Sequence, residues 1–294
     1  MSWALLTILA VFIFAVTTII DKFLLTKWIK NPIIPPLFFG LVGLLTSFII
    51  YLFYGFSFLA WQNVILALLA GFIYMAGEFL YYKAAKLEEI SRIMPLVFIS
   101  PLFILILAAV FLGEIFTPMK YLGMFLLVAG AIFISSKNFT KINFNKAFWF
   151  AVLSALMFAI LAILTKYLLD FADFWTIFSY IRLGVFLASV PVFYFYLKDF
   201  PSLIKESGLK SIGFMIFNAV LLLAGILLLT IATADGPITL VGALTSFQPF
   251  FTFILATSFT IFFPSILKEE ISKSLVFQKI FAIILIFIGA ILII

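Results

Sequence analysis

Very few side chains in this chain can do chemistry. The sequence contains no histidine and no cysteine, which excludes a thiol nucleophile, an imidazole base and any metal site built from Cys or His. Two ionisable residues, Glu78 and Arg182, lie within long apolar runs, where a charge is costly unless it faces a cavity or a partner. They are the first candidates for function, and we expect neither a cofactor nor a metal.

Glu78 lies in the stretch "GEFLYYKAAKLEEISRIMP", which runs from Gly77 to Pro95. We expect it about one turn inside the end of its apolar run. A carboxylate there is a candidate for proton coupling. The alternative is an interfacial ion pair with Lys83 or another lysine close by, which would leave Glu78 no role beyond structure.

Arg182 lies deeper, roughly 12 Å into its apolar run. At that depth a guanidinium must meet a carboxylate, backbone carbonyls or a substrate anion. We therefore expect Arg182 either to bind substrate or to form a structural ion pair with Asp170 or Asp173.

Uncharged polar residues within the apolar runs are further candidates for substrate binding. An amide that faced lipid would be unpaired, so we expect Asn218 and Gln248 to face a cavity. Tyr74, Ser100 and Tyr180 could complete its walls. The alternatives are anchoring at the membrane surface for Tyr and a bond to the local backbone for Ser.

Two prolines, Pro101 and Pro249, lie at matching places in two apolar runs. Each removes a backbone donor and can kink its helix. Kinked helices near a cavity would suit gating.

The elements that must position these residues are membrane helices. Apolar residues make up 66% of the chain and charged residues 10%, against about 25% charged in soluble domains. Runs of roughly 20 apolar residues, long enough to cross a bilayer, occur at 3–20, 36–55, 62–82, 93–112, 119–135, 147–165, 174–197, 211–232, 238–263 and 275–293. The predicted fold is an all-α integral membrane protein with ten transmembrane helices.

The basic residues indicate an orientation. Of the 18 Lys and Arg residues, 15 lie in the odd-numbered connections and two, Lys120 and Lys166, in the even-numbered ones. An excess of Lys and Arg marks the cytoplasmic side. We therefore predict that both termini lie outside, in a multi-pass protein of the cell membrane. Because the lipid bilayer explains the net charge of +6, we expect no nucleic-acid partner.

The chain also repeats itself. A shift of 148 residues aligns Ala84 with Ala232 and Pro101 with Pro249, and "VAGAIFI" resembles "FIGAILI". We predict one five-helix repeat over 1–136, a cytoplasmic linker over 137–146 and a second repeat over 147–294. Two units with an odd number of spans must enter the membrane in opposite directions, an arrangement that is concentrated among transporters.

The segment from Tyr81 to Ile134 resembles an EamA-type half of the drug/metabolite transporter superfamily. The shared features are an Ala-rich end of the third span, Pro101, the "LGE" turn at Leu112 to Glu114 and a Gly-rich fifth span. The resemblance implies a ten-helix carrier of small metabolites. The second-half turn reads "KEE" where "GE" is usual, and only one of the two expected arginines is present, at Arg182.

We therefore expect a secondary transporter, and no enzyme, that moves an amino-acid-like molecule or an organic anion by alternating access. The alternatives are a carrier or flippase for a lipid-linked sugar and a membrane-embedded enzyme. The enzyme would need paired embedded carboxylates, a histidine or a nucleotide loop, which the sequence does not display. The sequence leaves monomer and homodimer open.

Overall fold

The computed structural model describes residues 2–27, 34–57, 59–87, 90–135, 145–196, 200–262 and 273–293. These residues form twelve α-helices and one 3-10 helix, and no β-strand occurs among them. Eight helical segments are long and apolar enough to span a membrane, and two shorter apolar helices cover Pro118–Ile134 and Phe277–Ile293. The prediction of an all-α membrane protein is confirmed, and the ten apolar segments match the ten predicted runs.

The helices of the first predicted repeat are α1 (Trp3–Lys27), α2 (Ile34–Tyr54), α3 (Trp61–Leu87), α4 (Ile90–Val97), α5 (Ser100–Phe111) and α6 (Pro118–Ser135). Those of the second are α7 (Lys146–Leu168), α8 (Phe174–Tyr196), α9 (Phe200–Asp235), α10 (Ile238–Leu244), η1 (Thr245–Phe247), α11 (Gln248–Phe262) and α12 (Lys273–Ile293). Residues 137–144, most of the predicted linker, lie outside the described part of the chain.

The fourth and ninth spans are each broken in two. Pro101 lies in the first turn of α5, directly after the break that ends α4. Pro249 is the second residue of α11 and follows the 3-10 turn of η1. A proline is tolerated in the first turn of a helix, where its missing N–H would have no intrahelical acceptor. The two prolines therefore mark new helix starts, which is a stronger interruption than the predicted kinks.

Two helices extend beyond their apolar runs. α1 continues to Lys27 and α3 to Leu87, whereas the predicted spans end at 20 and 82. Hydropathy detects only the apolar length, and the Lys, Leu and Ala residues that follow it are good helix formers that prolong both helices. The correction moves Asp21 and Glu78 from near the predicted ends into the helices.

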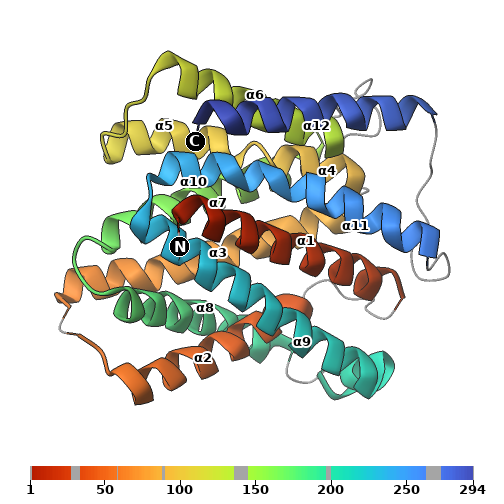
Figure 1. The fold of residues 1–294 in the computed structure, drawn as a ribbon. Helices are drawn as coiled ribbons and strands as arrows, with labels where there is room; N and C mark the ends of the chain where they lie inside the picture. Colours follow the sequence, from red (N-terminus) through yellow and green to blue (C-terminus); the bar gives the residue numbers. More distant parts are fainter. Residues whose placement is uncertain are drawn as a thin grey trace.

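The helices pack mainly in pairs that join the two halves of the chain. α3 packs along α7, and their counterparts α9 and α1 pack along each other. Corresponding spans also meet directly, α2 with α8 and α6 with α12. In Figure 1, α6 and α12 run side by side along one edge of the bundle, and both chain ends lie at its left.

Glycines allow α3 and α8 to cross with their backbones in contact. A Cβ atom on Gly71 would lie 2.3 Å from the carbonyl oxygen of Ile181. A Cβ atom on Gly184 would lie 2.3 Å from the carbonyl oxygen of Leu68. No side chain fits at such distances, so the two glycines fix the crossing next to Arg182.

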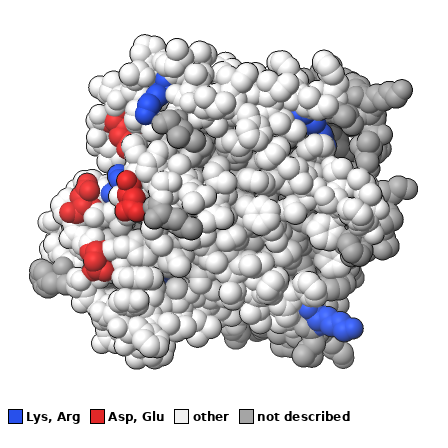
Figure 2. Space-filling model, viewed as in Figure 1, with Lys and Arg blue, Asp and Glu red and all other residues white. Residues whose placement is uncertain are grey.

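Acidic residues gather at one end of the bundle. In Figure 2 the Asp and Glu residues lie at the left end, where Lys or Arg also appear. The right end of this face shows Lys or Arg without Asp or Glu, beside residues that are not described. The predicted orientation depends on the count of Lys and Arg in all connections.

Candidate functional site

A central cavity of about 310 Å³ lies between the two predicted repeats. Its walls come from the first to fourth and the sixth to ninth spans, and no described residue of α6 or α12 lines it. The volume falls at the lower end of the range of about 300–1,000 Å³ for small-molecule sites. Aromatic and aliphatic side chains form most of the wall, and the charged side chains that face it are Asp21, Glu78 and Arg182.

Arg182 comes from α8 and is almost fully buried, with 4% of its surface exposed. Its guanidinium carbon lies 5.1 Å from the centre of the Tyr74 ring and 5.3 Å from that of Phe178. Both contacts are within cation–π range. Its Nε atom is buried without a hydrogen-bond partner. The guanidinium therefore keeps a donor and a positive charge for another group.

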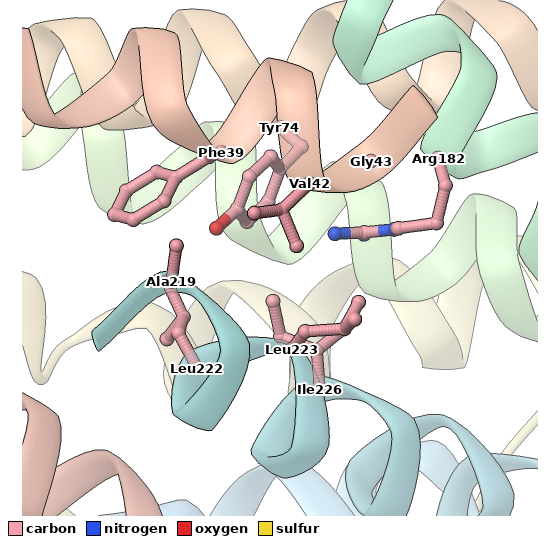
Figure 3. A pocket seen from close by; sticks show the side chains of 9 residues that line it. All are labelled: Phe39, Val42, Gly43, Tyr74, Arg182, Ala219, Leu222, Leu223 and Ile226. Carbon is pink, nitrogen blue, oxygen red and sulfur yellow. The ribbon is translucent and has the colours of Figure 1, made fainter. Parts of the chain in front are cut away.

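Figure 3 shows how Arg182 extends across a narrow space that adjoins the cavity. Tyr74 and Val42 lie on one side of this space, and Leu222 and Leu223 of α9 lie on the other. Its volume of about 10 Å³ accommodates roughly one water molecule. Apolar walls at such close range exclude bulk solvent, which strengthens the interaction of the guanidinium with any anion.

The alternative interpretation of Arg182, an ion pair with Asp173, is wrong. Asp173 caps the start of α8, where its Oδ1 atom accepts from the Thr176 backbone nitrogen at 3.1 Å and its Oδ2 atom from the Thr176 hydroxyl at 2.7 Å. The Ser57 hydroxyl also donates to Oδ2. Partial burial raises the pKa of Asp173, but these hydrogen bonds outweigh it and leave the pKa below its usual value.

Glu78 faces the cavity from α3, roughly 13 Å before the helix ends at Leu87. Tyr74 lies close enough to interact with both the Glu78 carboxylate and the Arg182 guanidinium. Glu78 and Arg182 also attract each other electrostatically. The structure thus joins two predicted site residues through a third, and it gives Glu78 this environment in place of the expected pair with Lys83, which is exposed.

Asp21 is a cavity residue that sequence reasoning missed. The apolar run ends at 20, so Asp21 falls in a predicted connection, although α1 continues past it. It lines the cavity together with Phe14, Thr17 and Thr18. These residues are spaced three and four apart, as expected for one helix face. That periodicity, extended by one turn, is the signal that could have found Asp21.

The two predicted amides have different positions. Gln248 lines the cavity and its Nε2 atom donates to the Thr18 hydroxyl at 3.1 Å. Asn218 does not line the cavity, and its Nδ2 atom donates to Asp21 Oδ1 at 2.8 Å. Asn218 is therefore a neighbour of a cavity residue.

Of the remaining predicted site residues, some line the cavity and others do not. Tyr74, Ser100 and Pro101 line the cavity, and Pro249 is buried but does not. Tyr180 does not line it either, because its ring packs at 4.9 Å against Phe56 in the connection between α2 and α3. The expectation that Tyr180 forms a cavity wall is wrong, since it points to the other side of α8.

One charged residue from the connection after α5 and one from α7 hold the junction between α9 and α10. Glu114 accepts the backbone N–H groups of Ile238 at 2.8 Å and Thr239 at 2.9 Å, which satisfies the start of α10. Lys166 donates to the carbonyl oxygens of Thr233 at 2.8 Å and Gly236 at 3.0 Å, at the end of α9. The "LGE" turn therefore serves the opposite repeat. The corresponding "KEE" at 268–270 lies outside the described residues.

Comparisons with known proteins agree with this architecture. Residues 1–136 match the EamA-like transporter family. No curated protein matches the chain. One of the solved structures that match, "Crystal structure of protein", superposes with a TM-score of 0.75 at 15% identity over 99% of this chain and 96% of its own. An identity of 15% establishes the likeness of the fold alone.

Proposed function

Since residues 1–136 match the EamA-like transporter family, we propose that the chain carries a small polar or amphipathic metabolite across the cell membrane by alternating access. The apolar helices support a multi-pass membrane protein, and the proposal concerns its transport function, its substrate and its mechanism. An amino-acid-like molecule or an organic anion is the substrate class that we favour.

The cavity around Arg182 is the observation that supports this substrate class. A buried guanidinium with an unpartnered Nε atom is suited to a carboxylate or phosphate, which can accept two parallel hydrogen bonds from it. Tyr74 and Phe178 add aromatic surface on either side. The mostly apolar wall favours a substrate with a hydrophobic part.

The broken helices support the proposed mechanism. Pro101 and the turn at Thr245 to Phe247 interrupt two corresponding spans beside the cavity. Discontinuous helices next to a central site are a recurring feature of transporters built from inverted repeats. We propose that the segments on either side of each break tilt as access alternates, with Pro101 and Pro249 at the pivots. Glu78, next to the substrate site, is the residue that we propose for proton coupling.

A thermal-stability screen followed by transport tests the proposal. Purified protein is heated with amino acids, sugar phosphates, nucleotides or lipophilic cations, because a ligand of the native state raises the apparent Tm. The ligand that raises it most is then offered to proteoliposomes. We expect an anionic or zwitterionic ligand to accumulate unmodified, and to raise the Tm of the Arg182→Gln variant less. A ligand that is converted chemically, or one that binds but never crosses, would overturn the proposed function.

A further inference from the structure

We propose that Asp21 and Asn218 form a proton-binding pair, in which protonated Asp21 donates a hydrogen bond to the amide oxygen of Asn218. Asp21 would be the proton carrier and Asn218 its positioning residue. The inference rests on the proposed transport function and adds a second carboxylate to the coupling site. It also gives Asn218 a role other than binding substrate.

The geometry leaves one acceptor of the pair unused. Asn218 Nδ2 donates to Asp21 Oδ1 at 2.8 Å. Asn218 Oδ1, on the same carbon as that nitrogen, is buried and has no hydrogen-bond partner. The side chain is 2% exposed between α1 and α9, so solvent does not satisfy it. A buried amide oxygen without a donor is unfavourable, and a donor must come from a neighbour.

Protonation of Asp21 supplies that donor. An ionised carboxylate only accepts, so it can use the amide N–H but offers nothing to the amide oxygen. A protonated carboxyl carries one O–H donor and still accepts through its other oxygen. The acid and the amide can then form two hydrogen bonds in a ring. The proton passes from cavity water to Asp21 Oδ2, where it forms the O–H bond, and it returns to cavity water when that bond breaks. No other covalent bond changes.

Burial and the nearby carboxylate of Glu78 both disfavour a negative charge on Asp21. The positive charge of Arg182 and the hydroxyl of Tyr74 both stabilise a negative charge on Glu78. Glu78 in turn repels a negative charge on Asp21. The described ionisable groups that act on Asp21 or respond to it are Glu78, Tyr74, Tyr81 and Tyr82 of α3. α9 and α11 face it with the uncharged amides Asn218 and Gln248.

Infrared spectroscopy of the purified full-length protein in lipid tests the pair, with the proton itself as the probe. The C=O stretching band of protonated carboxyls is recorded as the pH is lowered. We expect Asp21→Asn to lose one component of the band. We expect Asn218→Leu to keep that component but shift it to higher frequency, because the acid carbonyl loses the amide N–H. Thr230→Val, which alters another cavity residue of α9, should leave the band unchanged.

Two results would overturn the pair: an Asp21→Asn spectrum identical to wild type, or an Asn218→Leu component at the wild-type frequency. If Asp21→Asn does not fold, the Asn218→Leu shift decides alone. The measurement needs no substrate, so its outcome is separate from that of the transport assay. A wild-type protein that transports but lacks the Asp21 component refutes the pair only, and one that shows it without transport refutes the proposed function only.

Discussion

Arg182 lies over the rings of Tyr74 and Phe178 beside the cavity, and its Nε atom lacks a hydrogen-bond partner. A guanidinium in that setting can act on a bound ligand as a charge and as a planar fork. Arg182→Lys keeps the charge and loses the fork, whereas Arg182→Gln loses both. We expect the affinity for the anionic ligand to fall in the order wild type, Lys, Gln, with a deficit of about 1.5 to 3 kcal/mol for Gln.

Titration calorimetry with the ligand from the stability screen measures this order. Lys120→Gln, which removes a positive charge outside the cavity, should bind as wild type. Normal binding by both Arg182 variants, together with a lower apparent Tm, would make Arg182 a structural residue and remove the main support for an anionic substrate.

The proposed coupling role of Glu78 can be tested by a single substitution. Its carboxylate faces the cavity beside Arg182, where loss of a proton changes the charge next to the substrate. We expect Glu78→Gln to abolish accumulation driven by a pH gradient and to leave substrate exchange measurable, because exchange needs no net proton movement. Proteoliposome assays of both modes, with Asp170→Asn as an exposed control, measure this. Full proton-driven accumulation by Glu78→Gln would contradict the coupling role.

A candidate site residue can be identified from the sequence where the cost of burying its charge is the deciding factor. Arg182 and Glu78 are costly in an apolar run, and that cost identifies them without a structure. Tyr180 and Asp21 are not predictable in this way. Which side of α8 faces the cavity, and how far α1 continues past its apolar run, depend on helix packing that hydropathy does not report.

Among the helices, α8 begins with the cap residue Asp173, which also links the connection before α8 to the connection between α2 and α3. Asp173 bonds Thr176 within the first turn and Ser57 in the connection between α2 and α3. The pKa of Asp173 is lowered in the folded protein. Its contribution to stability is therefore complete above its unfolded pKa of about 4 and is lost as the pH falls through the folded value.

Asp173→Ala should lower the stability at pH 7 by about 1 kcal/mol, as for loss of a helix cap. The difference in apparent Tm between the variant and wild type should shrink as the pH falls below about 4. Thermal unfolding in detergent at several pH values measures both effects, and Asp170→Ala, exposed in the same connection, is the control. A difference that stays constant with pH would show that the charge of Asp173 does not contribute.

The broken spans show what can be predicted about elements. Proline positions identify both breaks, because the missing N–H acts locally. The 3-10 turn before Pro249 and the kink at Gly208, whose φ of 77° suits glycine, are not predicted. The capping of α10 by Glu114 is not predictable either, because it joins residues that are 124 positions apart in the chain.

For the whole molecule, orientation is the prediction to test. The chain has no cysteine, so a single introduced thiol has no background. We expect an impermeant thiol reagent added outside intact cells to label Asp170→Cys and to spare Lys146→Cys, because Lys and Arg concentrate at the Lys146 end. Both positions are exposed, whereas Gly236 packs against Trp3 and would not tolerate a side chain. Labelling of Lys146→Cys alone would invert the topology.

At this scale the sequence predicts the number of spans well, since bilayer thickness sets the length of each apolar run. It does not reveal which spans form the cavity. The pairing of α3 with α7 and of α1 with α9 joins segments that are distant in the chain. The division at 1–136, 137–146 and 147–294 stays a prediction.

The contact between α6 and α12 has a mechanical consequence. A Cβ atom on Gly289 would lie 2.6 Å from the carbonyl oxygen of Gly123, and one on Gly130 would lie 2.8 Å from that of Ala282. Two helices joined by their backbones at several levels cannot slide without steric overlap, and no described residue of either lines the cavity. We expect α6 and α12 to stay fixed relative to each other while access alternates. Distances measured from a probe on α6 would then report how far the other eight spans move.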